Sequence, residues 1–235
     1  MTTHRAKVFV AAAIVMLCTQ SLSASGSCCV LSLSGRDRPI LSAIGSLAMS
    51  HERLGGHVYD LTQRAVILKG AYPLTDYLFL SAQIGLPVST NLSSPSSTLK
   101  GNSGFLYGVS VAAVLPEILH SVEILAAAGY SRSDARVKSA SSATRQTFNI
   151  TEFQTTLVAE MTIVPELAAY AGTRVYFGRN RLRTDATGEV AEGDREGNLS
   201  PFFGLRVNPW EHIGLIAEGS LGHTRVVSLT AAFRL

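Results

Sequence analysis

Apolar and polar residues alternate through most of this chain, and proline-bearing turns divide the alternating segments. The turns begin at Pro73, Pro116, Pro165 and Pro209, at intervals of 43, 49 and 44 residues. A period of two puts one class of side chain on each face of a β-strand, and a tight turn between two such strands makes them an antiparallel hairpin. The sequence therefore predicts an all-β chain built as a meander of hairpins.

Ten segments carry this alternation. In the clearest one, 151–163, Glu152 and Glu160 lie on one face and Phe153 and Leu157 on the other. One exception is Ile67, an apolar residue on the polar face of its segment. An even number of strands is what a closed antiparallel barrel from a single chain requires. The predicted strands are 41–50, 62–74, 78–86, 105–115, 121–131, 151–163, 167–177, 199–208, 212–222 and 225–235.

Alternation alone fits a soluble barrel or sandwich as well as a membrane barrel, because these differ in which face meets the apolar medium. The aromatic residues of the apolar face favour the membrane barrel, since they gather near strand ends, as at membrane–water interfaces. A soluble core would place its largest rings in the middle of the strands. The residues predicted to form two aromatic girdles are Tyr72, Phe105, Tyr107, Tyr130, Phe153, Phe177, Phe203 and Phe233.

The connections between predicted strands alternate in length. Long hydrophilic loops are predicted at 50–61, 87–104, 132–150 and 178–198, whereas the proline turns and the connection at 222–224 are short. Short turns on one side and long loops on the other are typical of outer-membrane barrels, with the short turns in the periplasm. The sequence thus predicts an up-and-down transmembrane barrel in a bacterial outer membrane, with both termini periplasmic and long loops extracellular.

The N-terminal region indicates export. Basic residues at 4–7, an apolar stretch at 8–18 and small residues at 21–27 form the pattern of a secretory signal peptide. The predicted organisation is a signal peptide at 1–26, a periplasmic leader at 27–38 and a barrel domain at 39–235. Cys18 would leave with the signal peptide, so a long-range disulfide is excluded. Cys28 is either lipidated or, with Cys29, a free or vicinal thiol.

The whole pattern resembles the small outer-membrane β-barrels of Gram-negative bacteria, of the OmpA and OmpX type but with ten strands. Its most specific element is the last strand, Val227-Ser-Leu-Thr-Ala-Ala-Phe-Arg-Leu235, which is similar to the signal read by the barrel assembly machinery. The family's terminal aromatic is replaced here by Leu235, with Phe233 two places earlier. The resemblance implies outer-membrane lipids and the assembly machinery as partners, and it implies no particular activity.

A membrane barrel turns its polar face inward, and the polar face of this chain is charged. Four cations and four carboxylates can neutralise one another there, because buried charges persist only when they are paired or hydrated. Two interpretations remain open, a salt-bridged plug that stabilises the barrel and a narrow pore for ions or small solutes. The eight charged residues predicted to face the lumen are Lys69, Glu123, Glu152, Glu160, Arg174, Arg206, Glu218 and Arg234.

Catalysis and surface binding are the other functions to weigh. Acid–base chemistry needs groups within hydrogen-bonding reach of one another, and nothing in the spacing brings the rim residues together. Motifs of serine hydrolases, zinc peptidases and phosphate-binding loops are absent from the sequence. We therefore predict a non-enzymatic scaffold without metal or cofactor, with surface loops for an unidentified ligand. The net charge of +3 includes cations of the signal region, so the mature protein would be near neutral and no nucleic-acid partner is predicted. The rim residues are His51, Glu52, His57, Asp60, Asp134, Asp185, Asp194 and His223.

Overall fold

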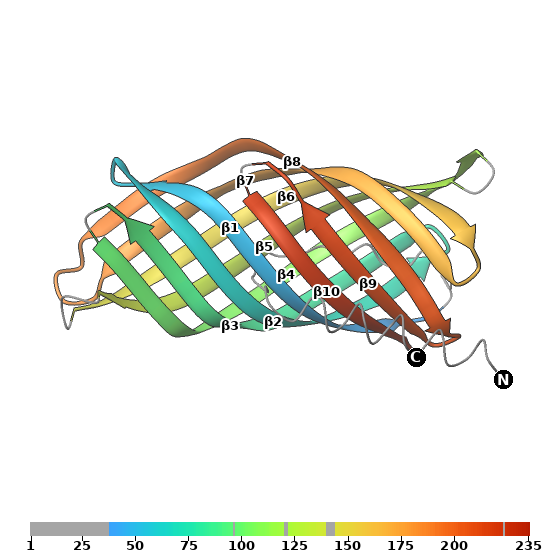
Figure 1. Cartoon of the computed structure of the whole chain (residues 1–235), viewed down its shortest axis with the longest axis horizontal. Helices are drawn as coiled ribbons and strands as arrows, with labels where there is room; N and C mark the ends of the chain where they lie inside the picture. The colour runs from blue at the N-terminus through green and yellow to red at the C-terminus, as the bar shows by residue number, and fades with distance from the viewer. Residues whose placement is uncertain (1–37, 96, 120–121, 140–143, 223) are drawn as a thin grey trace.

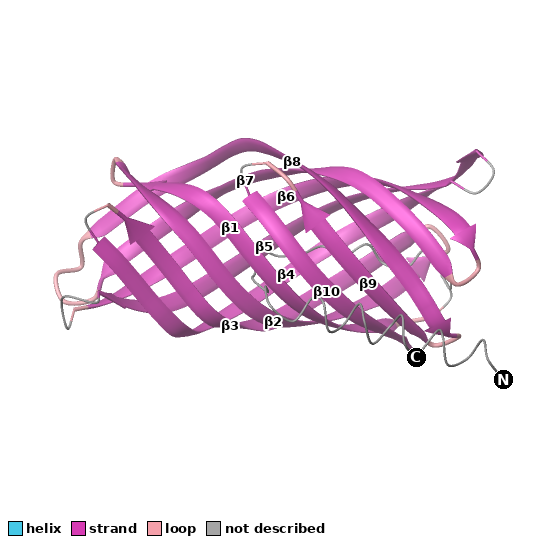
Figure 2. Ribbon diagram, in the orientation of Figure 1, coloured by secondary structure: helices cyan, strands magenta, loops and turns pink. Residues whose placement is uncertain are grey.

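Ten antiparallel strands form a closed up-and-down barrel, in which each strand pairs with its neighbours in sequence and β1 pairs with β10 (Figure 1). This computed structural model describes residues 38–95, 97–119, 122–139, 144–222 and 224–235, so the predicted signal peptide and all but the last residue of the predicted leader lie outside the described residues. The predicted ten-stranded barrel is confirmed (Figure 2). The strands are β1 (Ile40–Leu54), β2 (His57–Thr75), β3 (Leu78–Ser94), β4 (Ser97–Leu119), β5 (Val122–Ser139), β6 (Arg145–Val164), β7 (Leu167–Thr184), β8 (Val190–Trp210), β9 (Ile213–Ser220) and β10 (Thr224–Arg234).

Among the described residues, no helix is both long enough and apolar enough to cross a membrane.

The proline turns lie together at one end of the barrel. Ile40 at the start of β1 pairs with Arg234 at the end of β10, and we call this end the terminal end and the opposite end the distal end. Pro165 lies in the β6–β7 connection at this end, whereas Pro73, Pro116 and Pro209 lie in the last residues of β2, β4 and β8, where the strand register becomes irregular. In the first turn, the Thr75 hydroxyl accepts hydrogen bonds from the backbone N–H groups of Tyr77 (3.2 Å) and Leu78 (3.1 Å), which fixes the hairpin.

The prediction of long loops at the distal end is wrong. Most of their residues belong to strands, because β1 to β8 continue far beyond the predicted strand ends and the connections between them are short. Strands β1 and β2 are joined by Gly55 and Gly56 alone, whose φ values of 55° and 84° suit the two-residue turns preferred in hairpins. The polar segments are therefore hydrogen-bonded strands that lengthen the barrel wall. We call this part of the barrel, formed by the strand residues within 50–61, 87–104, 132–150 and 178–198, the distal extension.

At the distal end, β8 lies directly beside β1, because the short hairpin of β9 and β10 does not reach that far. Strands β9 and β10 stop well below the distal end, and Figure 1 shows β8 continuing past them. There the backbone N–H of Gly55 donates to the Glu192 carbonyl at 3.1 Å. A Cβ at Gly193 would lie 1.6 Å from the Arg53 carbonyl oxygen, so this approach between β8 and β1 requires a glycine.

The outer surface near the terminal end is apolar. Several apolar side chains there are more than half exposed: Val66, Leu86, Val109, Leu157 and Leu205. The residues that alternate with them along each strand point into the lumen. A soluble protein rarely exposes so extended an apolar patch, whereas a membrane barrel presents such a belt to lipid. The structure therefore favours the membrane barrel over the soluble alternative.

The arrangement of polarity reverses in the distal extension. Outward positions there are polar, for example Arg136 on β5, Thr147 on β6 and Arg183 on β7. Inward positions form an apolar cluster of buried residues, which we call the distal cluster: Leu54, Leu61, Leu92, Leu99, Val137, Phe148, Ile150 and Leu182. This is the arrangement of a water-soluble barrel, with its core inside.

Candidate functional site: the lumen and the rim

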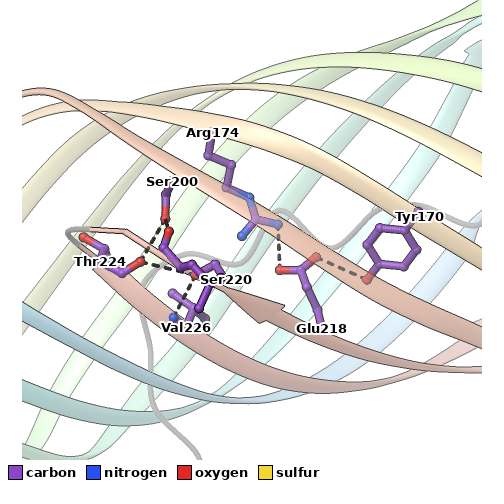
Figure 3. A network of polar contacts seen from close by, with 8 residues as sticks. Tyr170, Arg174, Ser200, Glu218, Ser220, Thr224 and Val226 are labelled. Atoms are coloured by element: carbon purple, nitrogen blue, oxygen red, sulfur yellow. Dashed lines mark hydrogen bonds and ion pairs between the residues drawn. The ribbon is translucent and has the colours of Figure 1, made fainter.

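A buried ion pair on the inner face of the barrel joins β7 and β9, the two neighbours of β8. The Arg174 side chain donates to the Glu218 carboxylate at 2.7 Å, and both side chains are almost completely buried. The Tyr170 hydroxyl donates to the other oxygen of Glu218 at 3.2 Å (Figure 3). The guanidinium of Arg174 also stacks 4.0 Å from the centre of the Phe202 ring. Four side chains from three consecutive strands thus hold one another on one side of the lumen.

A second ion pair lies nearer the terminal end. Arg206 on β8 donates to Glu160 on β6 at 2.6 Å, and both side chains are buried. These residues and the Arg174–Glu218 pair come from adjacent strands of the wall formed by β6 to β9. Such short, buried pairs fix side chains in place, and each charge at these positions is matched by its partner.

The other four charged residues predicted for the lumen have different surroundings. Lys69 and Glu152 are buried on the inner face. Glu123 is half-buried and falls on the inner face by alternation with Leu125. Arg234 lies at the terminal rim, where its side chain donates to the Glu211 carbonyl at 3.2 Å.

Lys69 borders a small cavity in the lumen. Its free volume is about 10 Å³, which is room for about one water molecule. Gln83 and Gln154 line the same cavity, and the structure gives no ion pair between Lys69 and another described residue. This part of the lumen is therefore polar and nearly full.

Glu52 is a lumen residue that the sequence analysis placed at the rim. It is 2% exposed, accepts a hydrogen bond from Ser50 at 2.5 Å, and accepts another from Asn180 on β7. The alternation of β1 continues from Ser50 through Glu52 to Leu54, and this continuation was the signal that could have revealed it. Gln63, which donates to Thr90 at 3.1 Å, belongs to the same buried polar layer.

Apolar side chains occupy the lumen on both sides of the polar residues. The distal cluster fills the end near Leu54, and a second cluster fills the lumen toward the terminal end. Protein interiors packed in this way leave few voids larger than a water molecule. The second cluster consists of Ile40, Ala71, Phe79, Ala112, Val114, Leu125, Val158, Tyr170, Phe202, Ile216 and Ala232.

The eight aromatic residues predicted to form girdles all have exposed side chains on the outer surface. The pairing register places Tyr130, Phe153 and Phe177 in one row across β5, β6 and β7. This row is where the outer surface changes from apolar to polar. Tyr72 and Phe233 lie toward the terminal end, on β2 and β10.

Two of the predicted rim residues come together. His51 Nδ1 and Asp60 Oδ1 lie 2.5 Å apart on β1 and β2, with about two thirds of each side chain exposed. They point outward from the barrel wall, away from the lumen. His57 is exposed at the start of β2, Asp134 and Asp194 lie on β5 and β8, and Asp185 lies in the β7–β8 turn. His223 is outside the described residues. No group of three metal-binding side chains gathers in the part of the chain that the structure describes.

No protein family model and no curated protein matches this sequence. Solved structures do match. The translocator domain of the autotransporter NalP from Neisseria meningitidis covers 84% of this chain and 88% of its own length, with a TM-score of 0.53 and 12% identity. The outer membrane protease OmpT from Escherichia coli covers 86% and 98%, with a TM-score of 0.50 and 9% identity. At such identities the likeness concerns the fold and not the activity. The fold of this chain is that of the β-barrel proteins of bacterial outer membranes.

Proposed function

We propose that this chain is a closed, non-conducting outer-membrane barrel that acts through its outer surface. The observation that carries the proposal is the filled lumen, in which apolar clusters lie on either side of a polar layer held by buried ion pairs. An ion that crossed it would have to pass the distal cluster without polar ligands, at a high cost in desolvation. A narrow channel finds less support, because Arg174 is neutralised by Glu218 and Arg206 by Glu160.

The proposed orientation puts the terminal end in the periplasm and the distal extension outside the cell. Short turns at one end support it, since outer-membrane barrels have short periplasmic turns. The polar outer face of the distal extension also supports it, because that face suits water or lipid headgroups and not acyl chains. Assembly through the last strand, β10, by the barrel assembly machinery is part of the same proposal.

A catalytic role is not proposed. The paired His51 and Asp60 are widely exposed on a strand surface, so water would surround any reacting group near them. Acid–base catalysis gains from groups held in a water-excluded site, which this pair lacks.

Planar-bilayer conductance of the folded protein tests the proposal. Folding is established first by heat-dependent gel mobility, and a porin of known conductance serves as the control in the same bilayer. We expect no current steps from the folded barrel. Reproducible steps whose ion selectivity changes in Glu218→Gln or Glu160→Gln would instead establish the channel.

A further inference from the structure

Outward-facing residues of β5, β6 and β7 form a regular grid just distal to the aromatic row of Tyr130, Phe153 and Phe177. The register pairs each outward residue of β6 with one on either side, and the alternation of burial shows that all of them point away from the lumen. Going toward the distal end, the rows are Arg132, Thr151 and Arg179, then Asp134, Asn149 and Arg181, then Arg136, Thr147 and Arg183.

This grid is a trough, which we call the arginine trough. Its two outer columns carry five arginines and one aspartate, and its middle column carries only short polar side chains. The outer columns are two strand spacings apart, or roughly 10 Å. Two adjoining hollows of about 670 and 410 Å³ overlie the trough and share Arg132, Asn149 and Arg183. Phe105, an exposed aromatic residue, also lines the larger hollow.

The half of the trough nearest the aromatic row is close to neutral. Arg132 donates to Asp134 at 3.2 Å, and Asn149 donates to the same carboxylate oxygen. Arg179 and Arg181 are paired with carboxylates of β8, at 3.3 Å to Asp194 and 2.7 Å to Glu192. Carboxylate, amide and hydroxyl groups in this half can exchange hydrogen bonds with the hydroxyls of a sugar.

The distal half of the trough is cationic. The structure gives no ion pair between Arg136 or Arg183 and any residue that it describes. In the next row, Lys138 on β5 lies opposite Arg145 on β6 in the strand register, and both side chains are exposed. The acidic residue that reaches this half is Asp185, which accepts a hydrogen bond from Thr147 at 3.1 Å. The cations Arg136, Lys138, Arg145 and Arg183 thus make this half positive, with Asp185 as the described carboxylate hydrogen-bonded to it.

We propose that the arginine trough binds a phosphorylated glycolipid of the surrounding outer leaflet. The site is continuous with the aromatic row, so acyl chains could lie on the apolar belt while the sugars extend up the trough. The arginine fork matches phosphate in geometry and charge, and Arg136 and Arg183 are placed to take it from two sides. A free anion would gain nothing from the adjoining aromatic residues, whereas a membrane lipid would.

The inference rests on the proposed orientation but not on the closed lumen. The conductance experiment can therefore refute the closed lumen without affecting the glycolipid site, and the binding experiment can refute the glycolipid site alone. Binding is measured by native mass spectrometry of the folded protein in detergent micelles. The probes are rough-type lipopolysaccharide, the same glycolipid after chemical removal of its phosphates, and inorganic phosphate. The test variant is R136Q/R183Q. The matched control, R64Q/R225Q, removes the same charge from exposed positions on β2 and β10, on the other side of the barrel.

We expect R136Q/R183Q to weaken binding of the phosphorylated probe by about ten-fold or more, because it removes two charged donors. The control should change it by less than about two-fold, since an exposed charge far from the site acts weakly through solvent. Wild-type protein should bind the dephosphorylated probe as weakly as the variant binds the phosphorylated one. Equal losses in the two variants, or equal binding of the two glycolipids, would overturn the proposal. Displacement of the glycolipid by inorganic phosphate at similar concentration would also overturn it, in favour of a free-anion site.

Discussion

The Arg174–Glu218 pair provides a test of whether the lumen is dry. The perturbation is Glu218→Leu, which removes the carboxylate 2.7 Å from the guanidinium and the acceptor of the Tyr170 hydroxyl. Breaking one partner of a buried pair costs about 3 to 5 kcal/mol, because the remaining charge loses its compensation. The companion variant R174M/E218L removes both charges and fills their space with apolar atoms.

The double variant should be the more stable of the two. Replacing both members of a buried pair with apolar residues of similar volume is often close to neutral. The lost stacking of Arg174 on Phe202 adds a cost of about 0.5 to 2 kcal/mol. We therefore expect Glu218→Leu to be less stable than R174M/E218L by about 3 kcal/mol, since the two variants cost about 4 and about 1 kcal/mol at the middle of their ranges.

Equilibrium urea unfolding in lipid vesicles measures this difference. Trp210, the single tryptophan of the chain, lies at the terminal end of β8 and reports the transition by fluorescence. Arg225→Gln, an exposed replacement on β10, serves as a control that should stay within about 0.5 kcal/mol of wild type. If Glu218→Leu costs no more than the double variant, water screens the charge of Arg174. The lumen would then be hydrated, as an open channel requires, and the argument for a closed barrel would be refuted.

Three further predictions concern substitutions in the strands of the barrel wall. Leu157→Arg and Leu215→Arg, on the lipid-facing surface, should each destabilise the barrel by about 2 to 4 kcal/mol in vesicle refolding titrations. Glu160→Gln, on the inner face, weakens the buried pair with Arg206 but should leave the yield of membrane insertion intact, and equal insertion defects in both classes would contradict the assignment of faces. Gly193→Val should separate β8 from β1 because the Arg53 carbonyl leaves no space for a side chain, so proteolysis near 190–194 should quicken while insertion is unchanged.

The sequence predicted the membrane-facing half of the barrel well, because one rule holds there. In β6, Phe153, Leu157, Ala159 and Met161 point outward and Gln154, Thr156 and Glu160 point inward, as predicted, with Thr155 outside and Val158 inside as the exceptions to the polarity rule. Ile67, the exception in β2, is fully buried among lumen residues. The prolines marked the terminal end of the barrel correctly, although Pro73, Pro116 and Pro209 lie in the last residues of their strands and only Pro165 lies between two strands.

The distal extension was missed because the alternation changes phase at the aromatic row. Along β6, outward positions are apolar from Phe153 toward the terminal end, but inward positions are apolar at Ile150 and Phe148. A shift by one residue in the apolar pattern looks like the end of a strand, although the backbone pairing continues without interruption. The same shift hid Glu52, which was assigned to a loop and lies in the lumen.

The phase change has a physical cause that also locates the candidate site. Lipid outside the barrel makes outward apolar side chains favourable, and water outside makes inward ones favourable, so the pattern must reverse where the medium changes. The reversal falls between Phe153 and Thr151 on β6, one row apart on the outer surface. Headgroups of the leaflet must then lie beside Arg132 and Arg179, the flanking residues of the row that contains Thr151. The arginine trough thus begins at the level where a phosphorylated headgroup begins, which is why a lipid and not a soluble anion is its best-matched ligand.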